Sequence, residues 1–102
     1  MICETYADYR NRANGFEVAM DYVVSRWELF EATTALALGI ERKGPMGLTP
    51  DAIKSKPEWK QFYGQYHALA KEARKLHAAN AKRYAKETRA EIQARREAKL
   101  KG

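Results

Sequence analysis

Apolar side chains recur along the first forty residues at alternating steps of three and four, which is the spacing of one face of an α-helix. The positions of this stripe are Tyr6, Tyr9, Ala13, Phe16, Met20, Val23, Trp27, Phe30, Thr34 and Ala37. Asn14 and Gly15 interrupt the stripe with a pair that is typical of turns. The sequence therefore predicts a short helix or turn that ends near Asn14, then a long helix over about residues 16–38. Gly39 is the predicted stop, because glycine readily takes the left-handed conformation that ends helices.

The stretch ERKGPMGLTPD is the predicted loop, because no regular element tolerates glycine and proline at this density. Thr49 has the character of a helix N-cap, with Pro50 in the first turn and Asp51 near the positive end of the helix dipole. A short helical turn is therefore expected at DAIKS. Ser55 and Glu58 then form the capping-box pattern S-x-x-E, which predicts a second helix start directly after it.

A second long helix is expected from Trp59 nearly to Leu100, because this stretch has no proline and only one internal glycine. Its apolar stripe comprises Phe62, Tyr66, Leu69, Ala73, Leu76, Asn80 and Tyr84. Beyond the last of these the stripe fades and charged residues dominate. We expect a helix there without a core of its own, supported by salt links among Glu87, Glu91 and Arg95.

These elements predict an all-α fold in which two long helices form an antiparallel hairpin around the loop, with one or two short helices beside them. We expect residues 1–84 to form the hairpin core and residues 85–102 a basic, solvent-exposed helical extension of the same domain. Two helices cannot cover the full apolar width of the first, so a partner is expected. It is either a foreign protein or a second copy paired through the stripe from Tyr6 to Ala37. The side chains left partly open are Tyr22, Val24, Trp27 and Phe30.

Charge is unevenly distributed along the 102-residue chain, whose length suits a single domain. Residues 1–40 carry a net charge of −3, whereas residues 71–102 carry +7 and exceed the net charge of the whole chain, +6. A basic surface of this kind suits a polyanion or an acidic protein surface, and it says nothing about the fold.

Cys3 is the only cysteine, and the first residues show neither a basic leader nor an apolar run. These features predict a reducing, cytoplasmic compartment. No apolar run approaches the roughly 18–20 residues that a membrane-spanning helix needs, so we expect no membrane span and no membrane partner.

Familiar catalytic motifs are missing from the sequence, which contains no glycine-rich phosphate loop, no C-x-x-C, no H-E-x-x-H and no nucleophile-elbow serine. We therefore expect a protein without enzymatic activity, catalytic residues or a cofactor. His67 and His77 lie ten positions apart on one expected helix, which is too far for a shared metal ion without ligands from elsewhere. The sequence predicts no metal site.

Trp59, Phe62, Tyr63 and Tyr66 crowd into eight residues beside several lysines. Interleaved aromatic and basic side chains are one signature of single-strand nucleic-acid binding. Phe62 and Tyr66 also continue the apolar stripe, so packing inside the hairpin is the favoured interpretation. Trp59 and Tyr63 are expected to cover the end of the hairpin.

The basic extension and the helix before it provide the candidate binding residues, which are Lys75, Lys82, Arg83, Lys86, Arg89, Arg95, Arg96 and Lys99. In the extension they spread around the expected helix, and Glu87, Glu91 and Glu97 interrupt them with charges that repel phosphate. Mixed signs favour docking on an acidic groove of a protein. A surplus of +7 over 32 residues exceeds what solubility requires, however, so direct contact with DNA or RNA remains the alternative.

The loop is a second candidate site. Gly44, Pro45 and Met46 present a Gly-Pro bond between two helices, and this arrangement looks like the Gly-Pro loops that cyclophilin-type prolyl isomerases capture. A plain interhelix turn needs the same residue types and is the favoured interpretation. A prolyl isomerase is kept as a candidate partner.

Residues 49–87, TPDAIKSKPEWKQFYGQYHALAKEARKLHAANAKRYAKE, resemble small helical accessory proteins of phage and prophage early regions, in which a Thr-Pro-acid turn precedes a Pro-Glu-aromatic helix. The resemblance implies a stoichiometric modulator of a host DNA-processing enzyme, such as the anti-nuclease proteins that protect phage DNA, acting in the host cytoplasm. It transfers no catalytic residue. It implies contacts through Lys82, Arg83, Arg95 and Arg96, with a host nuclease or another enzyme of DNA or RNA metabolism as the expected partner.

Overall fold

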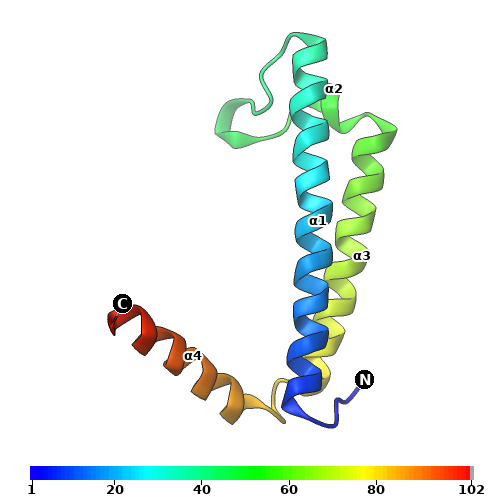
Figure 1. The fold of residues 1–102 in the computed structure, drawn as a ribbon. Helices are drawn as coiled ribbons and strands as arrows, with labels where there is room; N and C mark the ends of the chain where they lie inside the picture. The colour runs from blue at the N-terminus through cyan, green and yellow to red at the C-terminus, as the bar shows by residue number, and fades with distance from the viewer. Residues whose placement is uncertain (102) are drawn as a thin grey trace.

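The computed structural model describes residues 1–101 and shows two long antiparallel helices, with a further helix that leaves the pair at an angle (Figure 1). The elements are α1 (Tyr6–Leu38), the 3-10 turn η1 (Pro45–Gly47), α2 (Asp51–Lys54), α3 (Pro57–Asn80) and α4 (Ala85–Lys101). No strand occurs among the described residues, and the all-α prediction is confirmed. The radius of gyration is 18.4 Å, against about 13 Å for a compact domain of 100 residues. The difference reflects the length of the hairpin and the projection of α4.

α1 is one unbroken helix of 33 residues, so the break predicted near Asn14 is wrong. A single glycine such as Gly15 costs a helix only about 1 kcal/mol. On either side of this pair Ala13 is buried and Phe16 is half-buried in the hairpin core, and their burial outweighs that cost.

Local signals set both ends of α1. The Thr5 side chain caps the start by accepting a hydrogen bond of 3.1 Å from the backbone nitrogen of Asp8. At the other end Gly39 adopts a φ of 67°, and its backbone N–H bonds to the carbonyl oxygen of Leu36 at 3.2 Å. The predicted stop at Gly39 is confirmed.

The apolar stripes of α1 and α3 face each other along the hairpin. Near the loop, Trp27 packs on Trp59 and Tyr66 with ring centroids 5.2 and 6.2 Å apart, and Phe30 packs on Phe62 at 5.9 Å. The packing interpretation of Phe62 and Tyr66 is thus confirmed. The opposite end of the hairpin holds a buried cluster of Cys3, Tyr9, Ala13, Leu76 and Tyr84.

This packing also decides which face of α1 is open. The stripe from Tyr6 to Ala37 is taken by α3, so it is not a free seam for a second copy. The face of α1 opposite α3 remains open to a partner.

The two capping motifs predicted around the loop are wrong. The Thr49 hydroxyl donates a hydrogen bond of 3.0 Å to the Glu31 carboxylate instead of capping α2, which begins after Pro50 without a side-chain cap. The Ser55 hydroxyl donates to the carbonyl oxygen of Ala52 at 3.3 Å, and α3 likewise begins without a side-chain cap. For Thr49 the reason is chemical, because a carboxylate accepts a stronger hydrogen bond than a neutral group does.

α3 ends at Asn80 instead of running on to the end of the chain, and residues 81–84 form a turn before α4. The Asn80 side chain is fully buried and donates to the carbonyl oxygens of Leu76 and Met1 at 2.8 and 2.9 Å. Its Oδ1 accepts a hydrogen bond of 2.7 Å from the backbone nitrogen of Cys3. These contacts with the first residues of the chain fix the end of α3. The sequence has no glycine or proline at this point that would predict the break.

Within residues 1–101, no helix combines the length and the apolar character that crossing a bilayer requires.

Candidate functional site

α4 is fastened to the hairpin at its beginning and stands clear of it further on (Figure 1). The buried Tyr84 hydroxyl donates a hydrogen bond to the carbonyl oxygen of Cys3 just before α4 begins. Two turns later the Glu91 carboxylate accepts a hydrogen bond from the Tyr6 hydroxyl and lies 3.1 Å from Nε of Arg10. From residue 92 to residue 101 every side chain is exposed. α4 is therefore held to the hairpin at its beginning, which is called its root below, and projects from the hairpin beyond Glu91.

The protonation states of Tyr6 and Glu91 favour the contact between them. The hydrogen bond from Tyr6 lowers the pKa of the Glu91 carboxyl, and the positive charges of Arg10 and Arg95 lower it further. Burial raises the pKa of the Tyr6 hydroxyl, as does its hydrogen bond to Glu91. At neutral pH a neutral phenol thus donates to an ionised carboxylate, which is a charge-assisted hydrogen bond.

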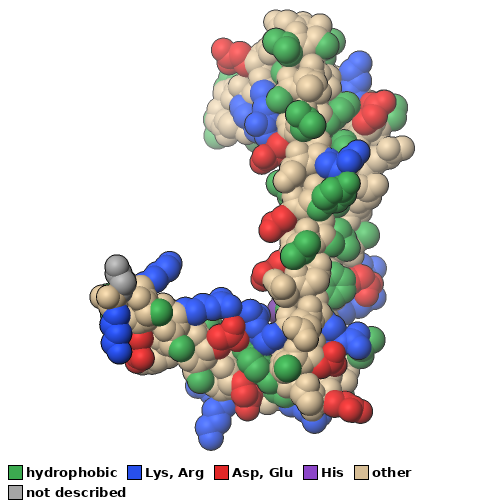
Figure 2. Space-filling view, viewed as in Figure 1, with side chains coloured by type: hydrophobic (Ala, Val, Ile, Leu, Met, Phe, Trp, Pro, Cys, Tyr) green, Lys and Arg blue, Asp and Glu red, His purple; other side chains and the backbone are tan. Residues whose placement is uncertain are grey.

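Four of the six basic side chains of α4 share one face, and the other two, Arg95 and Lys101, lie outside it. Successive helical residues are about 100° apart, which places the basic face within an arc of about 140°. This face, called the α4 basic face below, consists of Lys86, Arg89, Arg96 and Lys99 with the apolar Ile92 and Leu100 between them. Figure 2 shows Lys and Arg side chains in a row along the edge of α4 that faces the loop end of the hairpin.

The three glutamates occupy the remaining part of the helix circumference, and they are Glu87, Glu91 and Glu97. Arg95 and Lys101 lie among these glutamates, so the basic residues as a whole do spread around the helix with acids between them, as the sequence predicted. Within the α4 basic face, however, no glutamate intervenes.

The cations of the α4 basic face form no ion pair with any described residue, whereas Arg95, outside it, pairs with Glu91 at 2.7 Å. Lys82 and Arg83 are exposed in the turn at the root of α4, where the Arg83 guanidinium lies 5.6 Å from the centre of the Tyr84 ring. Half of the eight predicted binding residues thus share one open face, with two more beside its root.

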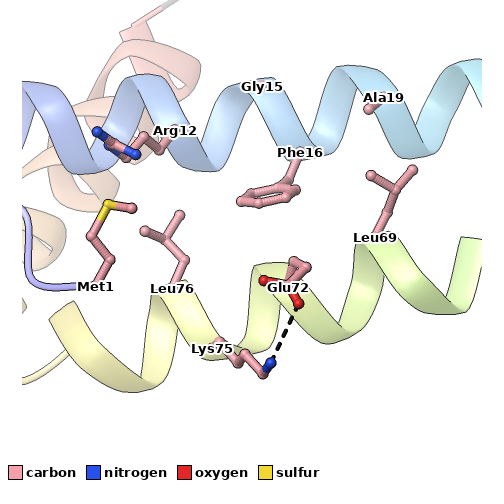
Figure 3. Close-up of a pocket in the computed structure, with 9 residues that line it drawn as sticks. All are labelled: Met1, Arg12, Gly15, Phe16, Ala19, Leu69, Glu72, Lys75 and Leu76. Atoms are coloured by element: carbon pink, nitrogen blue, oxygen red, sulfur yellow. Dashed lines mark hydrogen bonds and ion pairs between the residues drawn. The ribbon is translucent and has the colours of Figure 1, made fainter.

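Lys75 belongs to a different surface, an apolar groove of about 460 Å³ between α1 and α3 (Figure 3). The groove exists because Gly15 and Ala19 project little or nothing from α1 there. Its large apolar lining residues are Met1, Phe16, Leu69 and Leu76. Lys75 lies at the rim and pairs with Glu72 at 3.4 Å, so its charge is already compensated.

Glu31 ties the loop to the hairpin, and the sequence did not single it out for this role. Its carboxylate is buried and accepts hydrogen bonds of 3.0 Å from Nε1 of Trp59 and from the Thr49 hydroxyl. Arg42 and Lys43 approach the same carboxylate at 3.4 and 3.5 Å. The only signal in the sequence is a glutamate beside the apolar stripe of α1.

Burial by itself would raise the pKa of the Glu31 carboxyl. The hydrogen bonds from Trp59 and Thr49 and the charges of Lys43 and Arg42 outweigh burial, so the pKa of Glu31 lies below its ordinary value. Glu31 is therefore ionised at neutral pH and holds the loop as an anion.

The tip of the loop presents Met46. Gly44 precedes the 3-10 turn formed by residues 45–47, and Met46 adopts a φ of 63°, a conformation that costs a residue with a side chain roughly 1–2 kcal/mol. Its side chain is 95% exposed. Gly44, Pro45 and Met46 are thus presented at the surface, as binding by a prolyl isomerase would require; that binding stays a prediction.

The two histidines are used in packing and hydrogen bonding. Nδ1 of His77 lies 2.6 Å from the Tyr9 hydroxyl oxygen, and the ring of His67 lies 4.2 Å from that of Tyr63. Across residues 1–101 no three His, Cys, Asp or Glu side chains converge on a point where they could hold a metal ion.

Comparison with known proteins returned no match to a protein-family model, a curated protein or a solved structure. Among the surfaces of residues 1–101 described above, the α4 basic face has the most uncompensated charge.

Proposed function

We propose that the chain is a non-enzymatic interaction protein of the phage-modulator type, and that α4 docks on a host protein that processes nucleic acid. A nuclease whose activity the chain inhibits is the leading candidate. The observation that supports this proposal is the composition of the α4 basic face, where unpaired cations surround Ile92 and Leu100.

An acidic groove with an apolar floor matches this composition. Such a groove neutralises the cations and also removes Ile92 and Leu100 from water, which are 45% and 88% exposed in the free chain. Phosphate contacts alone would make no use of the two apolar side chains.

The placement of α4 supports the same proposal. Because α4 stands away from the hairpin beyond Glu91, a groove can enclose it without meeting α1 or α3. The hairpin then lies outside the groove and covers the partner's surface beside it.

Direct binding of DNA or RNA is the second candidate function. It is favoured by the absence of acidic residues from the α4 basic face, since a glutamate there would repel phosphate. The two candidates differ in what they require of Ile92 and Leu100.

The test is capture of partners from nuclease-treated host extract by the immobilised full chain. Two double variants are compared with it, namely Ile92→Ser with Leu100→Ser and Lys86→Gln with Arg89→Gln. Lys60→Gln with Lys71→Gln, on exposed positions of α3, is the matched control.

The proposal predicts one protein partner that survives nuclease treatment, is lost with either α4 variant and is retained by the control. If nuclease treatment removes everything that the full chain captures, the nucleic-acid function takes its place. If a protein partner survives and the Ile92→Ser, Leu100→Ser variant captures it as before, the partner does not dock on the α4 basic face and the proposal is wrong.

A further inference from the structure

The face of α1 opposite α3 carries a second row of apolar side chains. Val18, Tyr22, Leu29 and Leu36 are 62%, 61%, 65% and 84% exposed. With Ser25 and Ala32 between them, the steps along the row alternate between four and three over residues 18–36. This is the seam spacing of a coiled coil, and it extends about 27 Å along the helix.

We propose that this row, called the outer seam below, pairs with the outer seam of a second copy of the chain, with the two α1 helices parallel. The proposal is independent of what α4 binds.

The charged residues beside the outer seam favour a second copy as the partner and a parallel orientation of the two α1 helices. In the heptad notation abcdefg, positions a and d form the seam of a coiled coil and positions e and g flank it. Tyr22 and Leu29 are at a, and Ser25 is at d. Asp21 and Glu28 are then at g, and Arg26 is at e. In a parallel pair each g residue faces the e residue of the next heptad in the partner. Asp21 of one copy then faces Arg26 of the other, twice by symmetry.

An antiparallel pair would bring the g positions of both copies together. Asp21 would then lie near the second copy's Glu28, and like charges at this distance repel. The sequence on the outer seam is thus complementary to itself in one orientation only.

The side chains are already placed for this contact. The Arg26 guanidinium lies 5.5 Å from the centre of the Tyr22 ring, and its NH1 donates to the Tyr22 hydroxyl at 3.0 Å. Neither Asp21 nor Arg26 forms an ion pair among the described residues, so both charges are available to a second copy. The seam is short and contains serine and alanine, so the pair is expected to dissociate on dilution.

The first test is the mass of the full chain by light scattering between about 1 µM and about 500 µM. We expect the mass to rise from one chain toward two. Leu29→Lys should keep the mass at one chain throughout, while Leu100→Lys, at an exposed position on α4, should behave as the unchanged chain. A dimer that Leu100→Lys removes and Leu29→Lys leaves intact would place the contact on α4 and overturn the proposal.

The second test fixes the orientation. In a parallel pair Ser25 faces Ser25 of the second copy, so Ser25→Cys should form an intermolecular disulfide under mild oxidation. Cys3 is buried and does not compete. Gln61→Cys, exposed on α3, is the control and should cross-link at least tenfold more slowly.

The ion pair gives a third readout. Asp21→Arg and Arg26→Asp should each shift dimerisation to higher concentration, and the double variant should restore it. A mass of one chain at every concentration, or cross-linking of Ser25→Cys no faster than that of Gln61→Cys, would overturn the proposal. So would a double variant that dimerises no better than the single ones.

Discussion

Asn80 fastens the start of the chain to the end of α3: its Oδ1 accepts a hydrogen bond of 2.7 Å from the backbone nitrogen of Cys3, 77 residues earlier. The same side chain donates to the carbonyl oxygens of Met1 and Leu76, and it has no exposed surface. This one amide therefore ends α3, orders the first residues and fixes the point from which α4 departs.

Asn80→Ala should lower the free energy of unfolding by roughly 2–4 kcal/mol, because two buried hydrogen bonds and a partly buried one are lost and their partners are left without replacements. Urea unfolding followed by circular dichroism measures this. Asn11→Ala, exposed on α1, is the control and should stay within about 0.5 kcal/mol of the unchanged chain. Equal effects of the two substitutions would contradict the role of Asn80.

Glu31→Gln should destabilise the chain by about 1–2 kcal/mol at neutral pH, because Arg42 and Lys43 lose the charge that they contact. The pKa of Glu31 in the folded chain lies below its ordinary value of 4.5. The unfolded chain therefore takes up the proton first as the pH falls, so the stabilisation by Glu31 is present above pH 4.5 and is lost as the pH falls from there through the lower pKa of the folded chain.

The pH dependence supplies the check on Glu31. As the pH falls below about 5, the stability of the unchanged chain should fall more steeply than that of Glu31→Gln, until the two curves meet. Glu91 also has a lowered pKa but titrates in both proteins, so the difference between the curves reports Glu31. Parallel curves would show that Glu31 is not held as an anion.

Two glycines should respond to alanine with opposite signs. Gly64 lies inside α3 with no atom within 4 Å of an added Cβ, so Gly64→Ala should raise stability by about 0.5–1 kcal/mol. Gly39 has a φ of 67°, so Gly39→Ala should lower stability by about 1 kcal/mol. Thermal unfolding measures both, and a destabilising Gly64→Ala would contradict the helical geometry at that position.

Glu91→Gln should loosen α4 without unfolding the hairpin. The substitution removes the charge that Tyr6 and Arg10 contact, so amide hydrogen exchange across residues 85–101 should become several-fold faster. Protection of α1 and α3 should not change. Glu97→Gln, on the exposed part of α4, is the control, and equal acceleration by both would show that Glu91 is not the anchor.

Where one or two neighbouring residues decide the structure, the sequence predicted it. The stop of α1 at Gly39 and the packing of Phe62 and Tyr66 are of this kind, since a glycine conformation and a helical stripe are local properties. The break expected near Asn14 failed because burial around Gly15 outweighed its weak helix propensity.

Features that depend on distant partners could not be predicted. The turn at residues 81–84 forms because Asn80 and Tyr84 make hydrogen bonds with the backbone of Cys3. Thr49 does not cap α2, because its hydroxyl donates a hydrogen bond to Glu31. The candidate site shows the same limit. The basic residues of α4 were identified from the sequence, but the sequence analysis did not recognise that four of them share a face without a glutamate.

The claim that α4 docks on a protein is tested by the affinity of the purified full chain for fluorescent single- and double-stranded DNA and RNA, measured by anisotropy between about 50 and 200 mM salt. If α4 docks on a protein, binding should stay in the non-specific range, with a Kd of roughly 10⁻⁴–10⁻⁶ M near physiological salt. A Kd far below that range, with a steep salt dependence that Lys86→Gln and Arg89→Gln reduce and that Ile92→Ser and Leu100→Ser leave unchanged, would contradict the claim. α4 would then be a nucleic-acid-binding helix.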